Sequence, residues 1–167
     1  MRMKKTISFI TLLFILTGCE IEEIDLIPTI SLSSSTSSIS IDEVTKLSLE
    51  ITDLETEIFG IGLRISFNEN IVEIDSISGI SKGDFLGSNT ISLSKINNNV
   101  LHFSAIVTED ATLSGSGTLF EFDIKGISAG TSVFTIINDG IFFIDKDGNE
   151  VIIQNLEKNN LEIYVYE

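Results

Sequence analysis

Apolar and polar side chains alternate along most of the chain beyond residue 29. In residues 59–67 every odd position is Phe, Ile or Leu, while the even positions are Gly, Arg and Ser. Residues 47–51, 101–107 and 120–124 repeat this alternation. A period of two places one face of a strand in the interior and the other in water, and no stretch keeps a helical period for three turns. The sequence therefore predicts an all-β fold made mainly of antiparallel strands.

Polar segments rich in Asn, Gly and Ser separate the alternating ones, for example Asn97-Asn98-Asn99 and Asp147-Gly148-Asn149, and such residues favour turns. Many short strands at this spacing, without an internal repeat, predict a single β-sandwich or jelly roll. We expect strands at residues 29–32, 37–41, 46–53, 58–67, 71–78, 90–96, 100–108, 119–125, 131–137, 141–145, 150–154 and 160–166.

The N-terminus carries the pattern of a secretory signal. Basic residues precede an apolar run at residues 7–16, which is shorter than the roughly 20 residues that span a bilayer. Leu16-Thr17-Gly18-Cys19 resembles the bacterial lipobox, which implies a diacylglycerol on the Cys19 sulfur and cleavage before that residue; the alternative is an ordinary signal peptide with a chance cysteine. We predict a signal peptide at residues 1–18, a lipidated tether at 19–28 and a domain at 29–167, held outside the cytoplasm at the cell envelope.

The charge balance excludes some partners. The chain has 25 acidic and 10 basic side chains, and three of the basic ones lie in the predicted signal. The remaining part would carry 7 basic against 25 acidic side chains, a formal charge of −18. Such a surface repels nucleic acid and anionic headgroups, so we expect no nucleic-acid partner. Cys19 is the only cysteine, so no disulfide can form within the chain.

Four segments resemble the cohesin family, in the order that cohesins have them. Residues 67–74 (Phe-Asn-Glu-Asn-Ile-Val-Glu-Ile) resemble a segment that cohesins share. In cohesins an aromatic residue is followed there by a short turn and then by an apolar strand that contains a Glu. Residues 36–43, 101–110 and 142–149 resemble the lead-in strand, a strand that ends in an acidic pair, and a late hairpin. The resemblance covers about residues 29–166. It implies a jelly-roll sandwich of about nine strands, related to carbohydrate-binding modules, whose known members are non-catalytic docking modules.

The resemblance also implies a face for a partner. In cohesins the sheet that contains the strands at 58–67 and 100–108 meets dockerin, and an apolar residue followed by a Glu lies at the positions of Ile106 and Glu109. We expect Ser92 and Ser94 on the same outer face, because residues 91 and 93 are apolar and would take the core side. The candidate contacts of an extracytoplasmic, dockerin-like protein are Arg64, Ser92, Ser94, His102, Ile106 and Glu109. The alternative for Ile106 is that a lone exposed apolar residue is common on any surface.

Catalysis is not expected. His102 is the only histidine, it falls on an outward position of a regular strand, and no nucleophile-elbow motif is present. Pairs of carboxylates for glycoside hydrolysis would need a substrate cleft, and the short loops argue against one. We expect neither an enzyme nor a cofactor.

Two other functions stay open from the sequence. Tyr164 and Tyr166 fall on the same outward side of the last strand and could form a small sugar platform, although packing at a sheet edge is the alternative. The chain would then be a carbohydrate-binding module acting in polysaccharide binding or catabolism. A structural spacer without a specific ligand is the third possibility.

A calcium site is a weak candidate at the late hairpin. Asp145, Asp147 and Asn149 have the alternate spacing with which calcium loops begin, but the position of the bidentate Glu is Leu156. The alternative is a hairpin turn in which Gly148 takes a positive φ. We therefore predict no structural metal.

Overall fold

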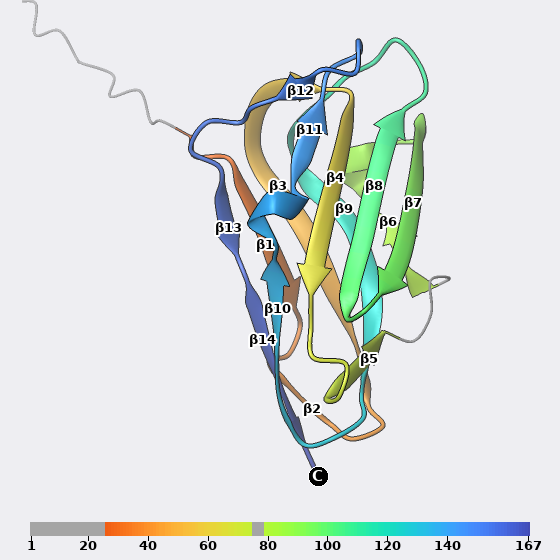
Figure 1. Cartoon of the computed structure of the whole chain (residues 1–167), viewed down its shortest axis with the longest axis vertical. Helices are drawn as coiled ribbons and strands as arrows, with labels where there is room; N and C mark the ends of the chain where they lie inside the picture. The colour runs from red at the N-terminus through yellow and green to blue at the C-terminus, as the bar shows by residue number, and fades with distance from the viewer. Residues whose placement is uncertain (1–25, 75–78) are drawn as a thin grey trace, which may run out of the picture.

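The computed structural model describes residues 26–74 and 79–167. In these ranges the chain forms two β-sheets that pack face to face as a sandwich (Figure 1). This architecture confirms the predicted all-β jelly-roll sandwich. The predicted signal peptide and Cys19 lie outside the described residues, as does most of the predicted tether. No helix in the described ranges is long and apolar enough to cross a membrane.

The first sheet is built around two long antiparallel strands, β3 and β9, which pair over most of their length. β1 pairs with the other edge of β3, β13 pairs in parallel with β1, and β5 and β6 both pair with β9. The bounds are β1 (Thr29–Ser34), β3 (Val44–Ile58), β5 (Val72–Ile74), β6 (Ser81–Lys82), β9 (Leu113–Gly126) and β13 (Glu157–Asn159).

The second sheet has β4 at its centre. β8 pairs along one edge of β4, and β7 pairs with β8. β11 and β10 share the other edge of β4, followed by β12 beyond β11 and by β14 and β2 beyond β10. The bounds are β2 (Ser38–Ser40), β4 (Gly60–Ser66), β7 (Thr90–Asn97), β8 (Val100–Val107), β10 (Gly130–Ile136), β11 (Phe142–Ile144), β12 (Glu150–Val151) and β14 (Leu161–Tyr166).

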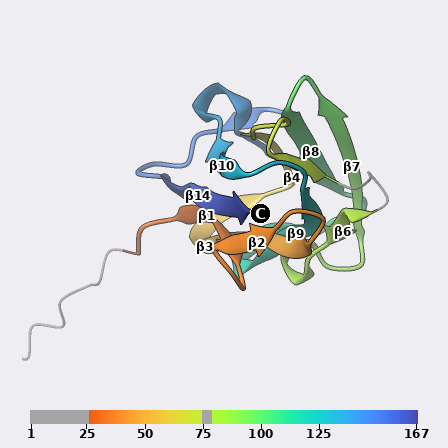
Figure 2. The same cartoon turned by 90° about the horizontal axis from the view of Figure 1, so that it is seen from below.

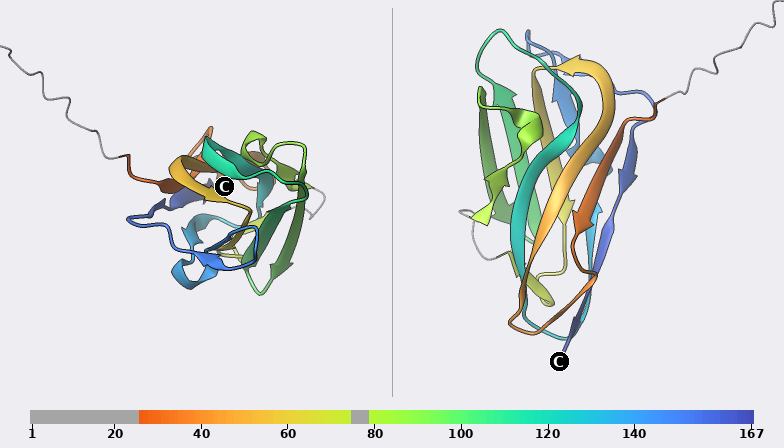
Figure 3. Two further views of the ribbon diagram at one scale, coloured as in Figure 1. Left: turned by 90° about the horizontal axis from the view of Figure 1, so that it is seen from above. Right: turned by 180° about the vertical axis from the view of Figure 1, so that it is seen from behind.

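The core fills the space between the two layers. Figure 2 shows β7 and β8 on one side and β9 and β6 on the other, and the rear view in Figure 3 shows β3 and β9 in front of β4 and β8. Phe120 and Phe134 are fully buried, and the Phe120 ring stacks on Phe103 of the facing sheet with a centroid distance of 4.1 Å. Ile61, Leu63 and Ile65 of β4 are also buried, as the alternation predicts.

Strand boundaries differ from the prediction where alternation breaks. β3 continues to Ile58 instead of ending near residue 53, because the pairing with β9 shifts register there and Asp53 adopts a φ of 57°. This irregularity keeps Leu54 and Ile58 on the buried side across three exposed residues. β12 ends at Val151 instead of residue 154. A local pattern cannot show such bulges and early ends, because pairing with distant strands decides them.

Several short elements were not predicted. β6 and β13 are polar strands of two and three residues that exist only through pairing with β9 and β1. Two single-turn 3-10 helices occupy Asp84–Leu86 and Asn138–Gly140. Of the fourteen strands in the described ranges, six have only two or three residues. Of the strand predicted at 71–78, the structure describes β5 at Val72–Ile74, and residues 75–78 lie outside the described ranges.

Candidate functional site

Four neighbouring strands, β11, β4, β8 and β7, form one continuous outer face. Their pairing aligns side chains in lateral rows, since directly opposed residues of antiparallel strands point to the same side. One row contains Ile144, Gly60, Ile106 and Ile91, and the next contains Phe142, Gly62, Ser104 and Leu93. The third row contains Arg64, His102 and Lys95.

The outer face carries large apolar side chains. The exposed fractions are 71% for Leu93, 57% for Ile91, 44% for Phe142 and 42% for Ile106. The outward orientation predicted for Ile106 is therefore confirmed, and three exposed apolar neighbours that the sequence analysis did not assign to this face accompany it.

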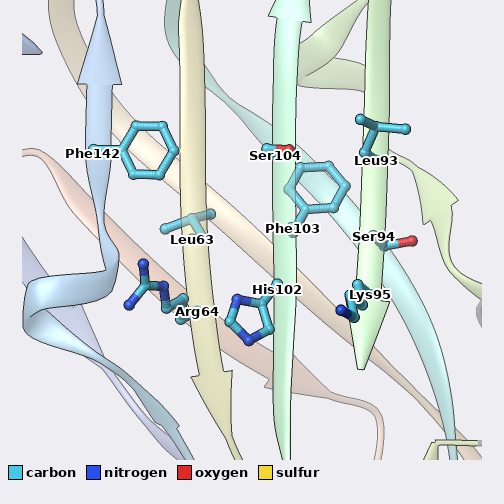
Figure 4. Close-up of a pocket in the computed structure, with 9 residues that line it drawn as sticks. All are labelled: Leu63, Arg64, Leu93, Ser94, Lys95, His102, Phe103, Ser104 and Phe142. Carbon is cyan, nitrogen blue, oxygen red and sulfur yellow. The ribbon is translucent and has the colours of Figure 1, made fainter. Parts of the chain in front are cut away.

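The orientation predicted for β7 is wrong. Ile91 and Leu93 point outward, whereas Ser92 and Ser94 point to the inner side and are half-buried. Ile91 pairs with Ile106, so an outward Ile106 requires an outward Ile91. The inward position near the end of β7 is filled by Ile96, which packs against the core. Ser92 and Ser94 therefore do not project from the outer face, where Leu93 and Lys95 take their place, although Ser94 still borders the hollow drawn in Figure 4.

Two glycines of β4 make room for side chains of β11. Gly60 and Gly62 fall on the outer side as predicted, but neighbouring side chains bury both. A Cβ at Gly62 would lie 2.0 Å from Cζ of Phe142, and one at Gly60 would lie 2.9 Å from Cγ1 of Ile144. The Phe142 ring therefore rests on the backbone of β4 and forms a fixed wall.

A shallow groove runs along β8 between this wall and Leu93. It consists of two adjoining hollows of about 230 Å³ each, and Phe142, Leu93 and Ser104 line both of them. Ile91, Ile106 and Ile144 line the first hollow, and Arg64, His102 and Lys95 line the second (Figure 4). We call this feature the docking groove. It has an apolar end and a cationic end.

The sequence-predicted site residues divide between this groove and other places. Arg64 and His102 lie at the cationic end, Ser94 borders that end, and Ile106 lies at the apolar end, whereas Ser92 lines neither hollow. Glu109 is exposed in the segment that follows β8, where its Oε2 accepts a hydrogen bond of 2.7 Å from Nδ2 of Asn89. The roles of these residues as partner contacts stay predictions.

His102 is placed unsuitably for acid–base catalysis. Arg64 and Lys95 flank it on the two neighbouring strands. A catalytic histidine needs a carboxylate or similar group that orients its ring and stabilises its positive charge. Neither of the two neighbours is a carboxylate, and no acidic residue of the described ranges lines the hollow at the cationic end to orient the His102 ring.

Tyr164 and Tyr166 are both exposed on the same side of β14, while Ile163 and Val165 are buried, as predicted. β14 is not a free edge, since it lies between β10 and β2. β10 and β4 separate the two tyrosines from β8, so they do not join the docking groove. Their role in sugar binding stays a prediction.

The acidic hairpin forms a turn with its own donors. Oδ1 of Asp145 accepts hydrogen bonds of 2.9 Å from the backbone N–H groups of Asp147 and Asn149, and Oδ2 accepts one of 3.0 Å from Nδ2 of Asn149. The Asn149 side chain, followed by its backbone N–H, holds the pKa of Asp145 below its ordinary value. Gly148 has a φ of 81°, as a tight turn requires. These three N–H donors take three of the roughly four acceptor positions of the Asp145 carboxylate and leave little of it for a cation.

Comparison with known proteins gives a match at the level of structure. No protein-family model matches the sequence, and no curated protein does. A non-cellulosomal cohesin from the archaeon Archaeoglobus fulgidus matches with a TM-score of 0.66 and 17% identity over 85% of this chain and 93% of that one. A type II cohesin domain from the cellulosome of Acetivibrio cellulolyticus matches with a TM-score of 0.69 and 19% identity over 83% and 95%. A further cohesin of that organism, solved in complex with a dockerin, matches with a TM-score of 0.68 and 16% identity over 84% and 100%. The chain therefore has a cohesin fold.

Proposed function

We propose that this chain, which has a cohesin fold, is a non-catalytic module that binds another protein through the docking groove. The observation that carries the proposal is the gathering of Ile91, Leu93, Ile106 and Phe142 on adjacent rows of one sheet face. Single exposed apolar residues are normal on a protein surface, but a contiguous set rimmed by polar residues marks an interaction site. Serine, arginine, lysine and histidine side chains supply the polar surroundings here.

The groove has the anatomy of a protein interface. Large apolar side chains form its two walls and include an aromatic one, and aromatic residues held in a packed position are frequent energetic anchors. Phe142 is held in this way, because its ring rests on Gly62. The anchor is therefore preorganised, which lowers the entropic cost of binding.

The proposed partner is a dockerin-like protein outside the cytoplasm. This part of the proposal is supported by the cohesin fold and by structural neighbours that were solved with a dockerin. The proposed attachment to the cell envelope is supported by the lipobox-like tetrapeptide that ends at Cys19. Nine residues lie between Cys19 and Thr29, and the ten residue steps that join the two positions reach at most about 35 Å. The module would therefore act close to the membrane surface.

The docking proposal is tested by capture from the secreted proteins of the source organism, with the full chain in mild detergent as bait. Leu93→Asp should remove the captured protein, because it replaces an apolar wall of the groove with a carboxylate that must lose its hydration on binding. Val133→Asp is the matched control, since Val133 is 47% exposed on β10 of the same sheet but does not line the groove. Equal capture by the wild type and Leu93→Asp would contradict docking at this face.

The anchoring proposal has its own test. Cys19→Ala should leave unprocessed precursor and abolish incorporation of labelled fatty acid, since no other thiol in the chain can accept the lipid. Labelling of the Cys19→Ala protein at the wild-type level would contradict the anchor.

Carbohydrate binding is a second candidate, and the exposed pair Tyr164 and Tyr166 on one side of β14 favours it. Replacing both tyrosines with alanine should then abolish retention on insoluble polysaccharide and leave protein capture unchanged. Retention that the double variant keeps would exclude this tyrosine platform.

A further inference from the structure

The docking groove ends in a cationic row although the molecule as a whole is strongly acidic. Arg64, His102 and Lys95 lie side by side on β4, β8 and β7 (Figure 4). The chain has 25 acidic and 10 basic side chains, and this single row takes two of the basic ones and the only histidine. None of the residues that line the two hollows is acidic.

The two charged side chains of this row are uncompensated within the described part of the chain. Salt bridges there join Lys46 to Glu121, Lys125 to Asp42 and Lys146 to Asp147, and neither Arg64 nor Lys95 takes part in one. Their guanidinium and ammonium groups are therefore available to a ligand. In a protein with an excess of carboxylates, an unpaired cationic row beside an apolar groove is a local reversal of charge.

We propose that the docking groove takes an acidic segment of a partner protein, whose carboxylates meet Arg64 and Lys95 while an adjacent apolar side chain enters between Phe142 and Leu93. This inference rests on the proposed docking function and adds the chemistry of the partner. Opposite charges at the rim mainly raise the association rate and fix the orientation, whereas the apolar centre supplies most of the affinity.

The spacing of the rows sets the geometry of the segment. His102, Ser104 and Ile106 follow one another at every second position of β8, so neighbouring rows are about 7 Å apart and the outer two about 13 Å. Arg64 and Lys95 are two strand spacings apart, about 10 Å. The backbone positions that carry the two cationic side chains are therefore about 10 Å apart and about 7–13 Å from the apolar rows, so a short peptide segment with acidic and apolar residues can reach both ends.

Other occupants fit less well. A polysaccharide would bring hydroxyl groups against the aliphatic end at Ile91 and Ile106, where they would lose hydrogen bonds to water. A second copy of this chain that docked through the same face would place the two cationic rows in a common interface, where like charges repel.

The test is a selection of random dodecapeptides displayed on phage, with the full chain in mild detergent as target. Wild-type protein should enrich peptides that combine Asp or Glu with Leu, Ile or Phe. The double variant Arg64→Glu and Lys95→Glu should bind the enriched peptides at least about tenfold more weakly in fluorescence anisotropy, and its own selection should favour Lys and Arg. Wild-type binding should weaken as salt is raised, because exposed ion pairs are screened.

The matched control is the double variant Lys146→Glu and Lys158→Glu. It changes the net charge by the same amount but lies outside the docking groove, so it should bind the peptides like the wild type. Loss of binding in this control would assign the effect to overall charge and overturn the inference.

Leu93→Asp separates this inference from the docking proposal. If Leu93→Asp abolishes peptide binding while charge reversal at Arg64 and Lys95 changes nothing, the docking function stands and the acidic-partner inference is wrong. If Leu93→Asp has no effect on peptides or on captured protein, the docking function itself is wrong. Three other outcomes would each overturn the acidic-segment assignment. The selected peptides could lack an acidic bias, or the protein could bind polygalacturonate, in a charge-dependent way, in place of peptides. The pure chain could also form a dimer that Leu93→Asp dissociates.

Discussion

A side chain at Gly62 would collide with the ring that forms one wall of the docking groove. The Cβ of Gly62→Ala would lie 2.0 Å from Cζ and 2.1 Å from Cε1 of Phe142, far inside the contact distance of about 3.5–4.0 Å. The ring must therefore move away from the sheet. Because Phe142 is 44% exposed, full displacement would forfeit roughly half of the 1.5–3 kcal/mol that burial of a Phe contributes, or about 1 kcal/mol.

The substitution also has a favourable term. Glycine in a strand is less stable than alanine by roughly 0.5–1 kcal/mol, since it loses more conformational freedom on folding. When Gly62→Ala is made in the otherwise wild-type protein, the lost burial of Phe142 and the gain from replacing glycine nearly offset one another if the ring moves freely. If the ring cannot move, overpacking adds about 1–3 kcal/mol of destabilisation. We expect Gly62→Ala to destabilise the protein by about 0.5–2 kcal/mol. In a Phe142→Ala background the obstacle is gone, so the same substitution should stabilise by about 0.5 kcal/mol.

The measurement is a double-mutant cycle of four full-length proteins, with unfolding in urea followed by intrinsic fluorescence and circular dichroism. The expected coupling free energy is about 1–2.5 kcal/mol, with a change of sign between the two backgrounds. Unchanged m-values would show that the native states remain equally compact. If Gly62→Ala changes the free energy of unfolding equally in both backgrounds, the ring does not occupy the space above Gly62 and the preorganised wall is wrong.

Three further outcomes follow from the core and the turns. Phe120→Ala should lower the free energy of unfolding by about 3–5 kcal/mol in a urea titration, because Phe120 is fully buried and stacks on Phe103; a loss below about 1 kcal/mol would contradict this packing. The pKa of Asp145 is lowered in the folded state, so its stabilising contribution is present above the ordinary carboxyl range and is lost as the pH falls through the lowered pKa. Asp145→Ser should therefore show a shallower loss of stability below about pH 4 than the wild type, and identical acid titrations would contradict the turn geometry. Addition of a chelator should leave the melting temperature unchanged, since N–H groups of the turn already occupy both Asp145 oxygens, and a fall of about ten degrees or more would identify a structural metal site.

The long strands could be predicted because alternation and burial agree in them. Ile61, Leu63 and Ile65 are buried on β4, and Leu101 and Phe103 are buried on β8, as the period of two requires. The short strands β6 and β13 could not be predicted, because their residues are polar and only their pairing partners hold them extended. The wall of the groove was missed for a related reason. Phe142 and Phe143 are adjacent, and a local pattern does not show which one points outward; Phe142 lies over Gly62, which is eighty positions earlier in the chain.

The register of β7, by contrast, follows from the length of the turn that joins it to β8. Asn98 and Asn99 have φ values of 48° and 54°, which are typical of a two-residue type I′ hairpin turn, and asparagine tolerates that conformation. A two-residue turn there places Asn97 opposite Val100, and each step back along β7 then matches a step forward along β8. Ile91 must therefore oppose Ile106 and share its face, so an outward Ile106 and an inward Ile91 are incompatible. Hydrophobicity alone favours Ile91 and Leu93 as core residues, but the turn fixes the register and places both outside. The same register puts Lys95 beside His102, so the apolar and cationic ends of the docking groove both depend on this two-residue turn.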